Sequence, residues 1–148
     1  MHQGVKFVNV NNTAGGMIKM INEALERDAN NNLRSSGTTM SQITVLLMLN
    51  ENADGTLTLK EIEHSLHCAQ STAHGLITRL EEKGFVISNG DPDDKRIRVV
   101  NITEKGIGCC RDAEEQMMQT EKRILQSLSK EEQKQFLTYL SKVKNTLI

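Results

Sequence analysis

A helical pattern followed directly by a hairpin pattern, over residues 69–102, constrains the fold of this chain more than any other feature. In the segment "AQSTAHGLITRLEEKG" the apolar residues recur at helical spacing on one face, namely Ala69, Ala73, Leu76, Ile77 and Leu80. The opposite face carries short or polar residues, namely Ser71, Thr72, His74, Gly75, Thr78 and Arg79. Gly84 predicts the end of the helix, because glycine readily adopts the left-handed conformation of a helix cap. The pattern therefore indicates a helix with a buried back and a polar front that can approach another surface closely.

A shorter helix pattern precedes this one. Thr58 followed by Glu61 is a capping box, in which the two side chains satisfy free backbone N–H groups at a helix start. The apolar side of this shorter helix consists of Leu59, Ile62 and Leu66. Two helices joined by a tight turn, the second with a polar front, predict a helix-turn-helix.

The hairpin pattern follows the helix pair. Residues 85–88 and 97–102 are β-prone, and the Gly-Asp-Pro-Asp sequence between them is typical of a turn. A hairpin in this position is the wing of a winged helix, and Lys95 and Arg96 in its loop suit the narrow, negative minor groove of DNA. We expect Asp91 to shape the turn and Asp94 to hold a nearby arginine, so that Arg96 projects stiffly.

Further helical patterns flank these elements and cover residues 14–33, 40–51, 104–127 and 129–147. Capping boxes at Thr39 with Gln42 and at Ser129 with Glu132 open two of them, and Thr103 can cap a third. The fold class predicted is mainly α with a small β-hairpin wing, in one domain over residues 1–148. Its parts are a flexible tail (1–13), terminal helices (14–37 and 104–148) and a winged helix-turn-helix lobe (38–103).

Composition narrows the class of protein. A chain of 148 residues suits one domain, and 3% aromatic residues without Trp leave Leu, Ile, Val and Met to build the core, as in a mostly helical protein. Three cysteines and the lack of a long apolar run predict a cytoplasmic protein with no membrane partner. The net charge of −1 argues mildly against nucleic-acid binding, which more often accompanies a basic surplus.

At the wing, the sequence resembles the MarR family of bacterial transcriptional regulators. The family's wing pattern is Asp-x-Arg, three residues, Val-x-Leu-Thr and, after two more, Gly. This chain has Asp94, Arg96, Val100, Ile102, Thr103 and Gly106. The preceding residues 56–86 are similar to the family's helix-turn-helix in length, in apolar positions and in the Leu-Glu-x-Lys-Gly ending. The resemblance covers roughly residues 14–147, and Ile102 in place of Leu is the one change in the wing pattern.

Two residues depart from the family's helix-turn-helix. His67 stands in the turn where the family often has Gly, which predicts slightly strained turn geometry. Gly75 stands in the middle of the reading helix, where a larger polar or basic residue is common. A mid-helix Gly costs about 1 kcal/mol relative to Ala, so Gly75 either permits close backbone approach to DNA or is simply tolerated. Base readout at that position is therefore open.

The resemblance implies a sequence-specific regulator of double-stranded DNA that acts as a homodimer on a pseudo-palindromic operator. The two reading helices would lie about 34 Å apart, one DNA turn. Apolar faces of the first, fifth and sixth helices, which the small lobe cannot cover, agree with a dimer. The family's usual outcome is repression, relieved by a small aromatic or anionic effector that binds the two states with different affinity.

Charge placement matters, because residues 59–98 hold six Lys or Arg against seven Asp or Glu. We expect the basic residues near the DNA to be Arg79, Lys95, Arg96 and Arg98. We expect Glu61, Glu63 and Glu81 to point elsewhere. Because phosphate contacts set the salt dependence of binding, a moderate salt dependence is predicted.

Other sites and functions were weighed against this interpretation. The segment "HSLHC" places His64, His67 and Cys68 close together, but zinc sites use three or four well-spaced ligands, so neither a metal nor a cofactor is predicted. A buried, unreactive thiol is favoured over redox sensing at Cys68 and at the adjacent Cys109 and Cys110. The chain has no motif or acid–base pair typical of an enzyme. The remaining alternative is a winged helix that contacts only protein, in which the wing arginine would be dispensable.

Overall fold

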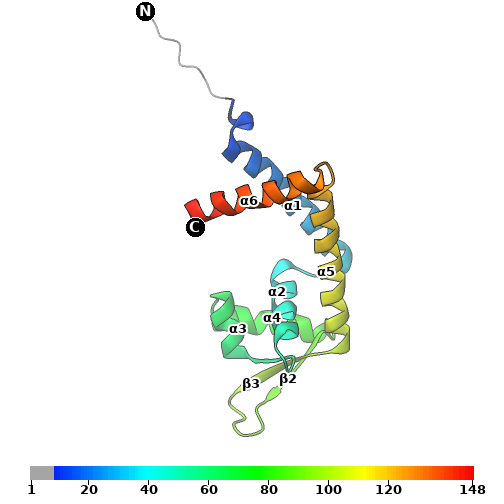
Figure 1. The fold of residues 1–148 in the computed structure, drawn as a ribbon. Helices are drawn as coiled ribbons and strands as arrows, with labels where there is room; N and C mark the ends of the chain where they lie inside the picture. The colour runs from blue at the N-terminus through cyan, green and yellow to red at the C-terminus, as the bar shows by residue number, and fades with distance from the viewer. Residues whose placement is uncertain (1–8) are drawn as a thin grey trace, which may run out of the picture. The chain divides into compact units, whose positions relative to one another are not determined.

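The computed structural model describes residues 9–148, which fall into two compact units, one ending at Cys110 and the other beginning at Arg111 (Figure 1). The elements of the first unit are η1 (Val10–Asn12), α1 (Ala14–Ser36), α2 (Met40–Glu51), β1 (Thr56–Thr58), α3 (Leu59–Leu66), α4 (Gln70–Glu82), β2 (Val86–Gly90) and β3 (Arg98–Ile102). Helix α5 (Glu104–Leu125) begins in the first unit and ends in the second, which also contains α6 (Lys130–Leu147). The mainly α fold class with a small hairpin is confirmed.

The core of the first unit lies where α2, α3 and α4 meet the sheet. Its buried residues are Val45, Leu46, Leu49, Leu59, Ile62, Ala73, Ile77, Leu80, Phe85, Val86, Val100 and Cys110. Burying a Leu or Ile side chain contributes roughly 1.5–3 kcal/mol, so this cluster is the main source of the lobe's stability. The apolar back predicted for α4 is confirmed, except that Ala69 is the exposed N-cap and lies outside the helix.

The sheet has three antiparallel strands in the order β1-β3-β2, one more than the sequence predicted. Thr56 pairs with Asn101 of β3, and the Thr56 hydroxyl donates to the Asn101 side-chain oxygen over 2.7 Å. Gly55 makes the preceding turn with φ of +62°, and its carbonyl accepts from Ile102 N–H. Strand β1 therefore anchors the base of the β2–β3 hairpin, whose loop projects beyond the helices of the lobe in Figure 1.

The ends of α3 and α4 fix the geometry of the helix-turn-helix. Helix α4 ends at Glu82, and Gly84, with φ of +75°, closes its C-terminal end. The N–H groups of Gly84 and Phe85 donate to the carbonyls of Glu81 and Leu80. Helix α3 ends in the same way, but the left-handed residue is His67, with φ of +50°. Among residues 9–148 it is the only non-glycine residue with positive φ, which agrees with the strain predicted for this turn.

All three predicted capping boxes are present, at the starts of α2, α3 and α6. The Thr103 hydroxyl accepts from Gly106 N–H at the start of α5, as predicted, and donates to the Gly84 carbonyl. Of the predicted tail, residues 1–8 lie outside the described residues. Residues 10–12 form the 3-10 turn η1, which Asn9 caps. The Thr13 hydroxyl, which caps α1, donates to the Val10 carbonyl and accepts from Gly16 N–H.

Among the described residues, several apolar side chains of the terminal helices are exposed. On α1, Met17, Ile18, Met20 and Ile21 are each about half exposed, and Gly16 is the one buried residue of this helix. No residue of α6 is buried. The exposed apolar residues of α6 include Leu137, Leu140, Val143 and Leu147. Both helices thus have the uncovered apolar surface that the sequence predicted.

Candidate nucleic-acid interface

The polar front of α4 faces solvent. Ser71, Thr72, His74 and Arg79 are exposed, while Gly75 and Thr78 are half-buried. The Thr78 hydroxyl donates to the His74 carbonyl over 3.0 Å, so its hydrogen is used within the helix. The structure therefore places all six residues of the predicted reading face together on one surface of one helix.

Within the described part of the chain, no contact requires a glycine at position 75. A Cβ built at this position meets no atom within 4 Å, and its backbone is ordinary helix without a positive φ. Internal packing therefore does not explain why glycine stands in the middle of α4. The remaining explanations are close approach of an external surface, or tolerance of the residue.

Asp91 makes three hydrogen bonds within the wing loop. Its Oδ1 accepts from the N–H groups of Asp93 (2.8 Å) and Asp94 (3.2 Å), and its own N–H donates to the Ile97 carbonyl over 2.7 Å. Such side-chain-to-backbone bonds are how aspartate holds a turn. A Cβ at Gly90 would lie 3.2 Å from the Lys95 carbonyl oxygen, so the loop also folds closely over this glycine. The wing tip is consequently a tied loop with its own hydrogen bonds.

Arg96 projects from this loop into solvent. Asp94 Oδ1 accepts from both Arg96 N–H (3.0 Å) and Arg96 Nε (3.3 Å). The Arg96 side chain nevertheless remains 94% exposed, so this pair is solvated and contributes orientation more than stability. The arginine that Asp94 holds is therefore Arg96 itself, and neighbouring Lys95 is exposed as well.

Arg98 lies on the inner side of the wing, against α4. Its Nε and Nη2 donate to Ser88 Oγ over 2.8 and 2.6 Å, and Nη2 also donates to Glu81 Oε2 over 2.9 Å. A further bond joins Nη1 to Nδ1 of His74 over 2.9 Å. The Arg98 side chain is 31% exposed and its charge is paired. Arg98 is therefore partly buried between the wing and α4, whereas Lys95 and Arg96 are exposed. The sequence predicts all three together near the DNA.

Sequence reasoning missed Ser88, and its expectation that Glu81 points away from the basic residues of this region is wrong, because Glu81 pairs with Arg98. Glu81 Oε1 accepts from the N–H and the hydroxyl of Ser88, over 2.7 and 2.6 Å. Burial raises the pKa of the Glu81 carboxyl, but the hydrogen bonds from Ser88 and the charge of Arg98 outweigh burial and hold that pKa below its ordinary value. Glu81 thus joins α4 to the wing as a carboxylate.

The histidines and cysteines outside this surface do not gather into a metal centre. Within residues 9–148 no group of three or more His, Cys, Asp or Glu side chains is placed to hold a metal ion, and His2 lies outside that range. The rings of His64 and His67 lie 6.2 Å apart. Cys110 is fully buried in the core, as the sequence favoured, while Cys68 and Cys109 are half-buried against it.

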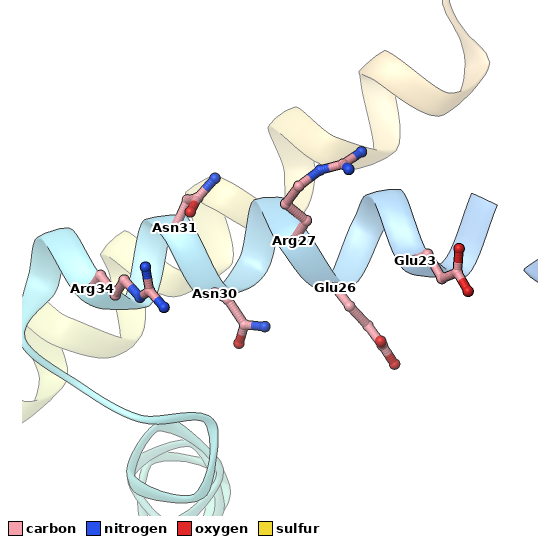
Figure 2. A pocket seen from close by; sticks show the side chains of 6 residues that line it. All are labelled: Glu23, Glu26, Arg27, Asn30, Asn31 and Arg34. Atoms are coloured by element: carbon pink, nitrogen blue, oxygen red, sulfur yellow. The ribbon is translucent and has the colours of Figure 1, made fainter. Parts of the chain in front are cut away.

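A shallow depression of about 390 Å³ lies on α1, lined by Glu23, Glu26, Arg27, Asn30, Asn31 and Arg34. Figure 2 shows these side chains fanning out along one helix, with Glu26 and Asn30 on one side and Arg27 on the other. The side chains do not converge on a common point, so the depression has no built ligand site.

Within the described range, no helix is long and apolar enough to cross a bilayer.

The winged helix-turn-helix lobe matches a known protein family. The family model described as "MarR family" matches residues 38–97, the segment that holds α2, the helix-turn-helix and most of the wing. Over these residues the chain is similar to the MarR family. The match includes the polar front of α4 and the wing tip at Arg96, so the predicted resemblance is confirmed.

Two curated relatives come from Bacillus subtilis (strain 168). HTH-type transcriptional regulator YfiV is 37% identical over 93 residues, which is 63% of this chain and 57% of YfiV. HTH-type transcriptional regulator MhqR is 29% identical over 83 residues, 56% of each chain. The match therefore spans little more than half of either relative. Both are named as regulators and neither as an enzyme, in agreement with the non-enzymatic prediction.

Solved structures extend the likeness in fold. The crystal structure of MepR, a transcription regulator of the Staphylococcus aureus multidrug efflux pump MepA, has a TM-score of 0.83 at 24% identity, covering 92% of this chain and 99% of MepR. A crystal structure of the MepR–DNA complex has a TM-score of 0.75 at 25% identity, covering 88% and 96%. These likenesses establish the winged-helix fold for this chain.

Proposed function

We propose that this protein is a transcriptional regulator that binds double-stranded DNA through α4 and the wing. The observation that carries the proposal is the joint exposure of the α4 polar front and of Arg96 within one lobe. Helix α4 would lie in the major groove, where its first residues meet base edges. Arg96 would enter the adjacent minor groove, whose narrow, negative character attracts arginine.

Electrostatics supports a moderate rather than a strong phosphate contribution. Arg79, Lys95 and Arg96 are exposed. Arg98 is paired with Glu81, so it adds little net charge to the surface. Each phosphate neutralised adds close to one unit to the salt slope. The MepR–DNA complex, at 25% identity over most of this chain, supports the same class of ligand.

Binding is tested by titrating the purified protein against the DNA upstream of its own gene and against a random duplex of equal length. The expected result is tighter, salt-sensitive binding to the upstream fragment, weakened by Arg96→Ala. Lys142→Ala, which removes an exposed positive charge of α6, is the matched control and is expected to bind as the wild type does. If neither duplex binds at low salt, a winged helix that contacts only protein replaces the proposal.

The proposal includes a homodimer held by the terminal helices. Four α1 side chains, Met17, Ile18, Met20 and Ile21, and the apolar face of α6 are exposed in the single chain. A second copy of the chain would remove this apolar surface from water, which is favourable by about 25 cal/mol per Å². Two copies would present two α4 helices to a pseudo-palindromic operator, one DNA turn apart.

Dimerisation is tested by light scattering on Leu140→Glu, which puts a charge into the apolar face of α6. We expect a monomer that keeps its helical circular dichroism, because Leu140 is 40% exposed and supports no core in the single chain. Asn145→Glu places the same charge on the opposite face of α6 and is expected to remain dimeric. If light scattering gives Leu140→Glu the same mass as Asn145→Glu and the wild type, the proposed interface is contradicted.

We further propose that the regulator acts in the bacterial cytoplasm as a repressor released by a small aromatic or anionic effector. The MarR-family match supports this part of the proposal. An effector shifts DNA binding only if its affinity differs between the two states. Benzoate and its uncharged methyl ester, added to the protein–DNA complex, distinguish a need for charge from a need for an aromatic ring. A repressor predicts higher expression of the controlled promoter when the gene is deleted.

A further inference from the structure

The hydrogen bond between Arg98 and His74 links the wing to the reading face of α4. Arg98 belongs to β3 and His74 to α4, and the two atoms that meet are Arg98 Nη1 and His74 Nδ1, 2.9 Å apart. Three other bonds fix the Arg98 guanidinium, two to Ser88 and one to Glu81. The guanidinium thus approaches His74 from a position set by the sheet and by α4 itself.

The chemistry of the two groups decides which one donates. A guanidinium has only N–H donors and no acceptor, so His74 Nδ1 must accept. A ring nitrogen accepts only when it carries no proton, and a neutral imidazole then carries its proton on the other nitrogen. The contact therefore selects the neutral Nε2–H tautomer of His74. A doubly protonated ring would lose the bond and would set a second positive charge beside Arg98.

Because His74 lies on the polar front of α4, its tautomer sets which hydrogen bonds its ring can offer to a bound partner. His74 lies in the first half of α4 and is exposed. It shares the polar front with Ser71 and Thr72. Hydroxyls can donate or accept, and so can an imidazole that is free to change tautomer. With Nδ1 occupied by Arg98, the His74 ring offers the outside only a donor, at Nε2.

We propose that Arg98 is a positioning residue that locks His74 as a hydrogen-bond donor, and that His74 Nε2–H reads an acceptor on a base edge in the major groove. The second part rests on the proposed DNA-binding function. In that groove the acceptors are N7 of the purines, O6 of guanine and O4 of thymine. The exposed amino groups of adenine and cytosine would be rejected, because two donors would face each other.

The lock is tested without DNA, by long-range ¹H–¹⁵N correlation spectra of the histidine rings at neutral pH. We expect the Nε2–H pattern for the ring that disappears in His74→Ala. The exposed ring of His64 is expected to show the averaged pattern of exchanging tautomers. In Arg98→Met the His74 ring is expected to change to that averaged pattern. An Nδ1–H or averaged pattern for His74 in the wild type overturns the lock.

Loss of the wing fold in Arg98→Met would confuse that result, so Ser88→Ala serves as a second variant. It removes the hydroxyl that accepts from Arg98 while leaving the charges of Glu81 and Arg98 in place. We expect a partial change of the His74 ring toward the averaged pattern, with the β-sheet amide signals retained. A ring pattern unchanged in both variants would mean that Arg98 does not set the tautomer.

Reading is tested with the best duplex selected from a random pool. His74→Ala is expected to lower affinity for that duplex by about tenfold to a hundredfold, with affinity for random DNA unchanged. Single bases are replaced by analogues that lack one acceptor: 7-deazapurines for N7, 2-aminopurine for guanine O6 and 5-methyl-2-pyrimidinone for thymine O4. One analogue is expected to weaken the wild type at one position of each half-site and to have no effect there in His74→Ala. An equal loss on selected and random DNA would assign His74 to a phosphate instead. If no duplex binds although the ring is locked, the proposed function and the reading role fail together, and the Arg98–His74 bond stands.

Discussion

Gly75→Ala separates what α4 needs for folding from what it needs for binding. The added methyl group meets no atom within 4 Å, and the site lies inside the helix Gln70–Glu82 with ordinary helical backbone. Alanine is favoured over glycine in a helix interior by about 1 kcal/mol. We therefore expect the free energy of unfolding to rise by about 1 kcal/mol in urea denaturation, and the melting temperature by roughly 2–5 °C.

The same methyl group is expected to weaken DNA binding. Among residues 9–148 nothing requires a glycine at this position, so this variant tests whether the α4 backbone approaches DNA closely there. An overpacked contact costs roughly 1–3 kcal/mol, which corresponds to about a fivefold to hundredfold loss of affinity. Stability and affinity should thus move in opposite directions in one variant.

Gly108→Ala is the matched control. A Cβ at Gly108 in α5 also meets nothing within 4 Å, and Gly108 is outside the polar front of α4. This control is expected to gain similar stability and to bind DNA like the wild type. Fluorescence anisotropy on one labelled operator measures all three proteins. Unchanged affinity in Gly75→Ala would refute close approach and leave Gly75 as a tolerated residue.

Three further predictions concern the lobe. Gly106→Ala is expected to lower the melting temperature, since its Cβ would lie 2.3 Å from the Phe85 carbonyl oxygen; a melting temperature at or above that of the wild type would contradict this contact. His67→Gly is expected to raise the free energy of unfolding by about 1 kcal/mol in urea, because the turn holds His67 at φ of +50°; no gain would mean that the turn is unstrained. The pKa of Glu81 is lowered in the folded protein, so the carboxylate stabilises the fold fully above the ordinary glutamate pKa. This stabilisation is lost as pH falls through the lowered value. The stability difference between wild type and Glu81→Gln should therefore be largest near neutral pH and shrink on acidification, and a constant difference would argue against the ion pair.

Most of the fold could be predicted because local signals and packing agree. The capping boxes, the left-handed Gly84 and the buried face of α4 each appear in the sequence as a short pattern with one structural meaning. Strand β1 could not be found in this way. Its three residues are too few for a periodic pattern, and they become a strand only by pairing with β3, which lies more than forty positions later in the sequence.

The candidate site shows the same division. Exposed Arg96 and the acidic turn of Asp91 followed from charge and turn chemistry alone. Arg98 was grouped with Arg96 because both are basic and close in sequence. Strand alternation was the signal available, since Arg98 lies two positions before buried Val100 and so shares its inward face. Its partners on α4 and β2 come from tertiary packing, which no local pattern in this sequence encodes.

The salt dependence of DNA binding in wild type and Arg96→Ala tests the central claim most directly. The dissociation constant would be measured on one operator duplex at several salt concentrations, and its logarithm plotted against the logarithm of salt concentration. We expect weaker binding by Arg96→Ala and a slope smaller by about one per protomer, because a positive charge in the minor groove neutralises about one phosphate and releases its counterion. Equal affinities and equal slopes for the two proteins would contradict a wing that binds DNA through Arg96.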